Sequence, residues 1–362
     1  MNGSSFLFFD ANTLWHKRLV ESLGEVADVT AFLPRSGCRI ALGKRESFGS
    51  GRSSFVPLTL PWGWASTVAS FVQPWLAGQV IRRFATLQTV AILASPAYRV
   101  LARHMRGHLP YVYYGTDDYR SYVGWGHDTA IAEAEICRGA MLSIFVSESL
   151  RSRAIREYGL PPNQTFVSPN ATEPRFLGPA DVIPELLIGR PRPVLGILGA
   201  LTDRLDLNLI RSATQLPQVG SLLIAGPVHP DIAHQPWLSH PKLVVSGKIP
   251  HEQMHSYALS MDAALIPYSA TRLNYHCSPL RMYDHLATGV PIFAADTCDQ
   301  IKRKQASGLM VRSPAQLVKG IESHVGDPRV LRRDEDLFWS RRAQDLNDSI
   351  TAARAEVQRR TA

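Results

Sequence analysis

Short apolar runs alternate with segments of helical spacing along most of this chain, in two successive series. In the first series, buried strands are predicted at 6–9, 90–93, 111–114, 141–146 and 165–168. Helices are predicted between them at 12–23, 129–138 and 149–158. Such alternation of strand and helix favours a parallel sheet with helices on both faces.

The second series begins after a proline-rich stretch at 183–193. Its predicted strands lie at 194–198, 221–226, 243–246, 263–267 and 292–295, with helices at 207–216 and 251–260. A charged, helix-prone tail follows from 327, with Phe338 and Trp339 as apolar anchors. We therefore predict an α/β protein with two Rossmann-like domains at 1–182 and 194–340, a linker at 183–193 and a terminal helix at 341–362.

The two domains should present a ligand site where their parallel strands end, because open α/β sheets bind ligands at the carboxyl ends of strands. Neither first turn carries the G-x-G-x-x-G spacing of a dinucleotide site: the second series has Gly196-Ile197-Leu198-Gly199 instead. A nicotinamide-dependent dehydrogenase is therefore weakly supported.

The segment 278–291 is the most informative part of the chain and predicts one short helix with both ends marked. Ser278 suits the N-cap and Pro279 the first helical position, while Gly289 can end the helix in a left-handed conformation. Arg281 and Asp284 fall on one face of this helix. A cation near a helix N-terminus suits phosphate, and a carboxylate one turn later suits ribose hydroxyls. An ordinary surface Arg–Asp pair is the alternative interpretation.

The pattern Ser-Pro-Leu-Arg-x-Tyr-Asp-x-Leu-Ala-x-Gly-x-Pro in this segment resembles the donor-binding helix of GT-B fold glycosyltransferases. The resemblance implies a C-terminal domain that binds a nucleotide diphosphate sugar and an N-terminal domain that binds the acceptor. It also implies that the terminal helix crosses back to the N-terminal domain, and that Asp284 holds the ribose. Phe166-Val167-Ser168-Pro169-Asn170 resembles a second element of the family, with Ala171 in place of its usual glycine.

Two further segments extend the resemblance to the donor site. The turn from Gly199 to Asp206 is similar to the family's diphosphate-binding turn, with Arg204 as the candidate cation. The loop from Ser246 is similar to the one that holds the nucleobase, which places Lys248 and Ile249 there. The predicted donor-binding residues are Gly199, Arg204, Lys248, Ile249, His276, Ser278, Pro279, Leu280, Arg281, Tyr283 and Asp284.

A catalytic base is expected at the end of a strand in the N-terminal domain. The run Tyr113-Tyr114-Gly115-Thr116 leads directly into Asp117 and Asp118, and this acidic pair resembles that of the glucuronosyltransferases that extend xanthan-type lipid-linked sugars. Either acid could take the proton from an acceptor hydroxyl. Either could equally cap the next turn. His16 is a second candidate base.

Retaining members of the family carry Glu-x₇-Glu with the second acid on the donor helix. If Asp284 is that second acid, the first position is His276, which is not an acid. This departure favours inversion of configuration. His276 remains a candidate contact to the sugar or a phosphate.

Composition narrows the possible partners. With 362 residues, 45% hydrophobic and 19% charged, the chain is typical of a globular protein. The net charge of +8 comes from scattered Lys and Arg without interleaved aromatics, so we expect no nucleic-acid binding. The four cysteines show no metal-ligand spacing, no Asp-x-Asp motif is present, and no metal cofactor is expected.

One segment of the first domain could lie against a membrane. The stretch 35–52 is basic and rich in Gly and Ser, and an apolar segment with Trp62, Trp64, Phe71 and Trp75 follows it. Basic groups beside aromatic side chains suit an anionic membrane surface, whereas a loop followed by a buried helix is the alternative. The apolar run at 70–81 is too short and too polar to span a bilayer, and 6–9 reads as a strand rather than as a secretory signal.

The sequence therefore predicts a cytoplasmic glycosyltransferase, peripheral at the inner membrane face, that uses a UDP-linked sugar and a glycan or lipid-linked glycan acceptor in exopolysaccharide synthesis. Uridine is favoured through the family resemblance alone. A sugar-nucleotide epimerase of the same fold and a non-catalytic nucleotide-binding subunit of a polysaccharide-assembly complex are the alternatives.

Overall fold

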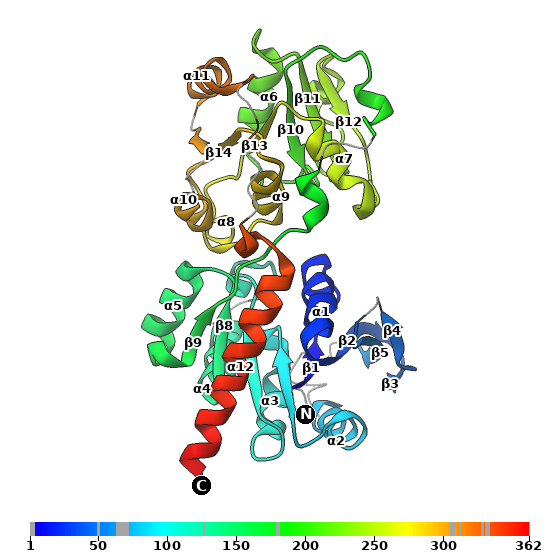
Figure 1. Ribbon diagram of the computed structural model, residues 1–362, viewed down its shortest axis with the longest axis vertical. Helices are drawn as coiled ribbons and strands as arrows, with labels where there is room; N and C mark the ends of the chain where they lie inside the picture. The colour runs from blue at the N-terminus through cyan, green and yellow to red at the C-terminus, as the bar shows by residue number, and fades with distance from the viewer. Residues whose placement is uncertain are drawn as a thin grey trace. The chain divides into compact units, whose positions relative to one another are not determined.

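The computed structural model describes residues 4–48, 51–62, 72–125, 127–178, 182–304, 308–311, 313–326, 329 and 334–361. The chain forms two compact units (Figure 1). Unit 1 comprises Met1–Asn170 and Trp339–Ala362, and unit 2 comprises Ala171–Phe338. Unit 2 therefore begins ahead of the predicted linker at 183–193.

Unit 1 is built on a nine-stranded sheet in the order β3-β5-β2-β1-β6-β7-β8-β9, with β4 also paired to β5. The strands are β1 (Ser5–Phe9), β2 (Asp28–Gly37), β3 (Ala41–Leu42), β4 (Glu46–Phe48), β5 (Ser53–Pro61), β6 (Thr89–Leu93), β7 (Tyr111–Gly115), β8 (Leu142–Phe145) and β9 (Thr165–Val167). All pairs from β5 to β9 along this order are parallel, and only β3 and β4 run antiparallel to β5. The five strands predicted in this half are confirmed.

Six helices of unit 1 lie in the described part of the chain. They are α1 (Leu14–Val26), α2 (Val72–Phe84), α3 (Arg99–Met105), α4 (His127–Gly139), α5 (Glu148–Tyr158) and α12 (Trp339–Thr361). The long terminal helix α12 packs against α1, so the charged tail belongs to unit 1. Buried Trp339, Ala343, Leu346 and Ile350 form the face that makes α12 part of this core.

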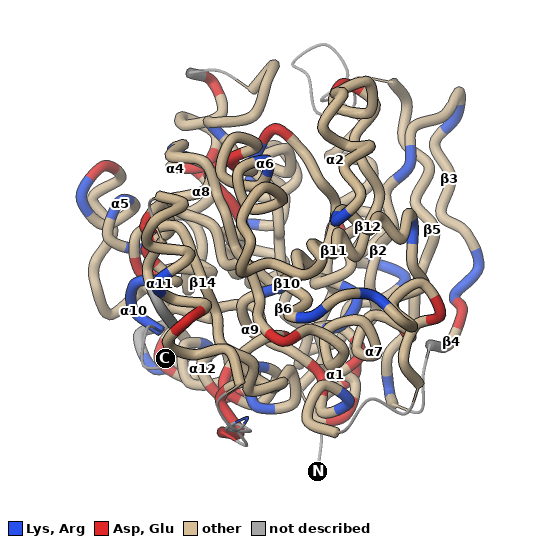
Figure 2. The backbone as a smooth tube through the Cα atoms, turned by 90° about the horizontal axis from the view of Figure 1, so that it is seen from above, with Lys and Arg blue, Asp and Glu red and all other residues tan. Residues whose placement is uncertain are grey.

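The interpretation of 35–52 as a loop is wrong. The segment contributes the end of β2, the short strands β3 and β4, and leads into β5. The alternation in β5, where Phe55, Val56, Leu58 and Leu60 are buried, is a strand pattern that the many Gly, Ser and Arg residues before it obscured. Basic residues of this segment lie near these strands (Figure 2): Arg35 is in β2, and Arg39, Lys44, Arg45 and Arg52 lie in the connections between the strands.

Unit 2 carries a six-stranded parallel sheet in the order β12-β11-β10-β13-β14-β15. Its strands are β10 (Val194–Leu198), β11 (Ser221–Ala225), β12 (Leu243–Val245), β13 (Ala263–Ile266), β14 (Ile292–Ala294) and β15 (Gly308–Met310). Numbered along the chain, this order is 3-2-1-4-5-6, the doubly wound arrangement of the Rossmann fold. The switch point therefore lies between β10 and β13.

Helices cover both faces of the unit 2 sheet. They are α6 (Leu207–Gln215), α7 (Met254–Leu259), α8 (Arg272–His276), α9 (Leu280–Thr288), α10 (Asp299–Arg303) and α11 (Pro314–His324). Side chains of β10 alternate between two buried clusters: Leu195 and Ile197 join one, and Val194 and Leu198 join the other. Within the described residues, no helix has both the length and the apolar character needed to cross a bilayer.

Candidate functional site

Helix α9 has the predicted C-terminus but a different N-terminus. It ends at Gly289 in the left-handed conformation, with φ of 69°, as predicted. The N-cap, however, is Pro279 rather than Ser278, and no side chain caps this end. The reason is local, because Pro279 itself is extended, with ψ of 117°, so the helix begins one residue later. Ser278 instead places its hydroxyl 3.3 Å from the Tyr283 hydroxyl.

Most of α9 is buried, and two polar side chains remain partly accessible. Tyr283 and Ala287 of the predicted apolar face are fully buried, while Leu280 is half-buried. Arg281 and Asp284 are also half-buried and lie one turn apart. These two side chains are the polar groups through which α9 can contact a ligand.

The glycine turn at the end of β10 faces Arg281. Gly199 has φ of 87°, and a Cβ atom added to it would lie 3.0 Å from Nη2 of Arg281. Gly226, after β11, packs so tightly on this turn that an added Cβ would lie 2.4 Å from the Gly199 carbonyl carbon. Two glycines therefore bring the backbone at the switch point close to a guanidinium group, which is the geometry that a phosphate-binding turn requires.

Arg204 contacts the same tyrosine ring as Arg281. The Arg204 and Arg281 guanidinium carbons lie 5.9 Å and 5.4 Å from the centre of the Tyr268 ring. Burial raises the pKa of Tyr268 to about 12, although both arginines act in the opposite direction, so its hydroxyl stays neutral. Nη1 of Arg281 is buried and has no hydrogen-bond partner among the described residues. A buried cationic donor of this kind is costly without a partner, and an anionic ligand can supply the acceptor.

Asn274 of α8 holds Arg204 in place. Its side-chain oxygen accepts a hydrogen bond from Nε of Arg204 at 3.0 Å. Its amide nitrogen donates to the backbone oxygens of Arg204 at 2.8 Å and Ser269 at 2.9 Å. The sequence analysis missed Asn274 and Tyr268. A tyrosine directly after the predicted strand at 263–267 was the available signal.

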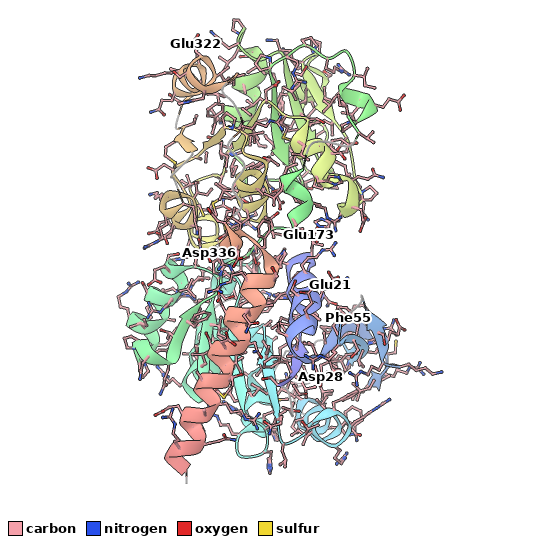
Figure 3. All side chains as sticks on the ribbon, in the orientation of Figure 1. Glu21, Asp28, Phe55, Glu173, Glu322 and Asp336 are labelled. Carbon is pink, nitrogen blue, oxygen red and sulfur yellow. The ribbon has the colours of Figure 1, made fainter. Side chains whose placement is uncertain are left out.

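The Asp284 carboxyl group lies in a polar cluster of unit 2. Thr172 donates to its Oδ1 at 2.6 Å. Glu173, labelled in Figure 3, lies nearby and pairs with Nε2 of His251 at 3.3 Å. Burial raises the pKa of Asp284 to about 7, while the Thr172 hydrogen bond and the charges of His251 and Arg281 act to lower it. Its second oxygen can accept hydrogen bonds from a polyol.

The other predicted donor residues are spread around these groups. Lys248 is exposed in the loop after β12, beside Gly247 with φ of 71°, whereas Ile249 packs on a buried cluster. The same loop leads to His251, which neighbours Asp284. His276 ends α8 and its ring packs edge-on against Tyr275 at 5.0 Å.

In unit 1, Asp118 belongs to a buried ion-pair network. It is fully buried, pairs with Arg153, lies 3.6 Å from Nε of Arg120 and accepts from Ser121 at 2.8 Å. Arg153 also pairs with Glu133 at 2.9 Å. A carboxylate held by arginines is a poor proton acceptor, so this network does not favour Asp118 as the catalytic base.

Asp117 is also engaged by its neighbours. Its Oδ2 accepts from the Tyr122 hydroxyl at 2.5 Å, and its Oδ1 accepts from the backbone N–H of Asp118 at 3.0 Å. Only 8% of Asp117 is exposed. As a base it would have to exchange these partners for a substrate.

His16 is not placed as an accessible base. It is 2% exposed, and its Nδ1 lies 2.6 Å from the backbone oxygen of Asp10. Because a carbonyl oxygen only accepts, Nδ1 carries the proton. Burial lowers the pKa of His16 to about 4, so the ring is neutral at pH 7. The ring packs among the aromatic rings of Phe8, Trp15 and Tyr114, which does not favour the prediction of His16 as a base.

Comparisons with known proteins agree with this architecture. No family model matches the chain. A protein of Bacillus subtilis (strain 168) named "Putative teichuronic acid biosynthesis glycosyltransferase TuaH" is 28% identical over 109 residues. That match spans 30% of this chain and only 28% of the relative, so it covers a minor part of both.

Solved structures match almost the whole chain. A sucrose-phosphate synthase from Thermosynechococcus elongatus superposes with a TM-score of 0.66 at 14% identity, covering 99% of both chains. HepE from Anabaena, solved with UDP and glucose, has a TM-score of 0.66 at 15% identity, again over 99% of both. A UDP-forming α,α-trehalose-phosphate synthase from Burkholderia vietnamiensis reaches 0.67 at 11% identity over 99% of both. The chain has the GT-B fold that these glycosyltransferases share.

Proposed function

We propose that this protein is a glycosyltransferase that moves a sugar from a nucleoside diphosphate sugar, with unit 2 as the donor-binding unit. The observation that carries the proposal is the cation cluster at the switch point of unit 2. There, the buried Nη1 of Arg281 lacks a partner among the described residues, beside the Gly199 turn, and Arg204 contacts the same Tyr268 ring as Arg281. A diphosphate supplies the charge and the acceptor oxygens that this cluster lacks.

The proposed mechanism assigns each donor-site residue one task. Arg281, Arg204 and the N-terminus of α9 stabilise the charge that develops on the leaving diphosphate, so the reaction needs no metal ion. Asp284 accepts hydrogen bonds from the ribose, and the loop with Lys248 and Ile249 contacts the base. His276, at the end of α8, contacts the sugar or a phosphate. Since position 276 offers no carboxylate, we propose inversion at the anomeric carbon.

A UDP-linked hexose or glucuronate is the proposed donor. Support comes from relatives of the same fold, because HepE was solved with UDP and glucose and the trehalose-phosphate synthase is named as UDP-forming. The name of the teichuronic acid relative supports a glycan acceptor in bacterial cell-surface or exopolysaccharide synthesis.

A lipid-linked acceptor at an anionic membrane is the finer proposal. Exposed Arg35, Arg39, Lys44, Arg45 and Arg52 occupy the β2–β5 edge of unit 1 (Figure 2). Trp62 and Trp75 are 73% and 45% exposed, whereas Trp64 and Phe71 lie outside the described residues. Flotation with vesicles containing 30% anionic lipid tests this, at about 0.1 M salt. If the protein stays at the bottom of the gradient, the membrane proposal is wrong, and the donor-binding proposal is unaffected.

Thermal stabilisation by UDP, GDP, ADP and their sugars tests the donor site. One nucleotide should raise the melting temperature of the wild type and fail to do so in Asp284→Ala and Arg281→Ala. If no nucleotide raises the melting temperature of well-folded wild-type protein, the transferase proposal is wrong. If UDP binds but no sugar is transferred, a non-catalytic binding subunit is favoured, and conversion of the donor without any acceptor indicates an epimerase.

A further inference from the structure

The acid at the end of β1 occupies the position where an open α/β sheet places its ligand. β1 pairs with β2 on one side and with β6 on the other. The strands that follow β1 up to β5 lie on the β2 side, and the strands from β6 to β9 lie on the other side. The switch point of unit 1 therefore lies between β1 and β6. Asp10 is the first residue after β1.

The backbone of Asp10 is held in an unusual conformation. Its φ is 76°, and it is the one residue other than glycine with positive φ in the described part of the chain. The His16 ring fixes this conformation by donating to the Asp10 carbonyl at 2.6 Å, and the next residue, Ala11, bonds to the Phe32 carbonyl at 3.0 Å. Such strain persists where the surroundings over-determine it, and it concentrates at functional sites.

The Asp10 carboxyl group has no hydrogen bond or ion pair with any described residue, in contrast to Asp117 and Asp118. It is partly buried. The titratable groups that face it are the hydroxyls of Tyr98 and Tyr119, from the segments after β6 and β7, and the neutral His16 on α1. Burial raises the pKa of Asp10 to about 6. The group is therefore mostly ionised at pH 7 and more basic than an ordinary aspartate.

We propose that Asp10 is the catalytic base of this protein, and that His16 is the positioning residue that aims it. The inference rests on the proposed glycosyl transfer with inversion. The acceptor O–H proton passes to the Asp10 carboxylate as the acceptor oxygen forms a bond to the anomeric carbon. The bond from that carbon to the diphosphate oxygen breaks, and its electron pair leaves with the nucleoside diphosphate. Asp10 then returns the proton to solvent.

Release of UDP from UDP-glucose, UDP-galactose, UDP-N-acetylglucosamine and UDP-glucuronate tests the assignment, with water and octyl glycosides as acceptors. Asp10→Asn should lower the rate at least 100-fold and leave the UDP dissociation constant unchanged. The wild-type rate should rise with pH through about 6, and this inflection should be absent in the variant. Asparagine tolerates positive φ, so the variant should fold.

Controls separate the possible failures. Asp28→Asn changes an exposed aspartate of the same unit, labelled in Figure 3, and should keep the wild-type rate. A normal rate in Asp10→Asn, together with a large loss in Asp117→Asn, overturns the assignment and leaves glycosyl transfer standing. Wild-type protein that binds UDP but never releases it from any donor overturns both proposals.

For His16, the decisive readout is the pH profile. His16→Gln can still donate to the Asp10 carbonyl and should retain the inflection near pH 6. His16→Leu should lose rate without loss of UDP affinity. Equal rates and equal pH profiles in wild type and His16→Leu would contradict the positioning role.

Discussion

Replacement of Arg281 by methionine should weaken UDP binding strongly while changing the stability of the fold little. The guanidinium leaves Nη1 buried without a partner among the described residues, and Nη2 lies next to the Gly199 turn. A hydrogen bond to a charged group contributes about 1.5–3 kcal/mol. Its loss corresponds to a UDP dissociation constant about 10- to 150-fold higher.

The stability of Arg281→Met follows from two opposing changes. Removing a buried donor without a partner stabilises the free protein by about 1–3 kcal/mol. Losing the contact of the cation with the Tyr268 ring costs about 0.5–2 kcal/mol. Since the two changes nearly cancel, Arg281→Met should have a melting temperature close to that of the wild type, although its affinity for UDP is much lower.

Isothermal titration calorimetry with UDP and with uridine, at fixed salt, measures the effect. Uridine affinity should be unchanged, because it lacks the diphosphate. Arg281→Lys should be intermediate, since it keeps the charge but loses the planar fork. Arg211→Met, on the exposed side of α6, is the matched control. Unchanged UDP affinity together with a melting temperature several degrees lower would refute the reasoning.

Three further substitutions test the surrounding structure. His285→Leu should raise the free energy of unfolding by about 1–3 kcal/mol at pH 7.5, since both ring nitrogens are buried without partners among the described residues. Burial lowers the His285 pKa to about 3. Below pH 6.5 the unfolded state therefore binds more protons than the folded state, and the free energy of unfolding of the wild type decreases as the pH is lowered. The leucine variant should therefore gain about 2 kcal/mol more at pH 5 in urea unfolding, and an equal gain at both pH values would contradict this. Asn274→Ala should weaken UDP binding about fivefold by releasing Arg204, with uridine binding unchanged, and a loss for both ligands would indicate general disorder instead. Arg153→Met should cost about 3–5 kcal/mol in thermal unfolding because two buried carboxylates lose their cation, and stability like that of the wild type would show that the network is neutral.

The basic edge of unit 1 shows where pattern recognition failed. Strands β2 and β5 pair along nine residues from Val29↔Ser53 to Gly37↔Pro61, yet the glycine, serine and arginine content between them suggested a loop. The C-terminal parts of both strands are only partly buried, and such residues carry a weaker apolar signal than fully buried strands. By contrast, every residue of β6 and β7 is buried, and both strands were predicted within one or two residues.

What the sequence determined by itself is local. The buried strands, the alternation that requires a parallel sheet, and the end of α9 at a left-handed Gly289 depend on residues within a few positions of one another. The identity of the reactive groups depends on distant contacts. Asp118 meets Arg153 across 35 positions, Asn274 meets Arg204 across 70, and Thr172 meets Asp284 across 112. Whether a carboxylate is paired or available depends on these partners, and only the tertiary structure brings them together.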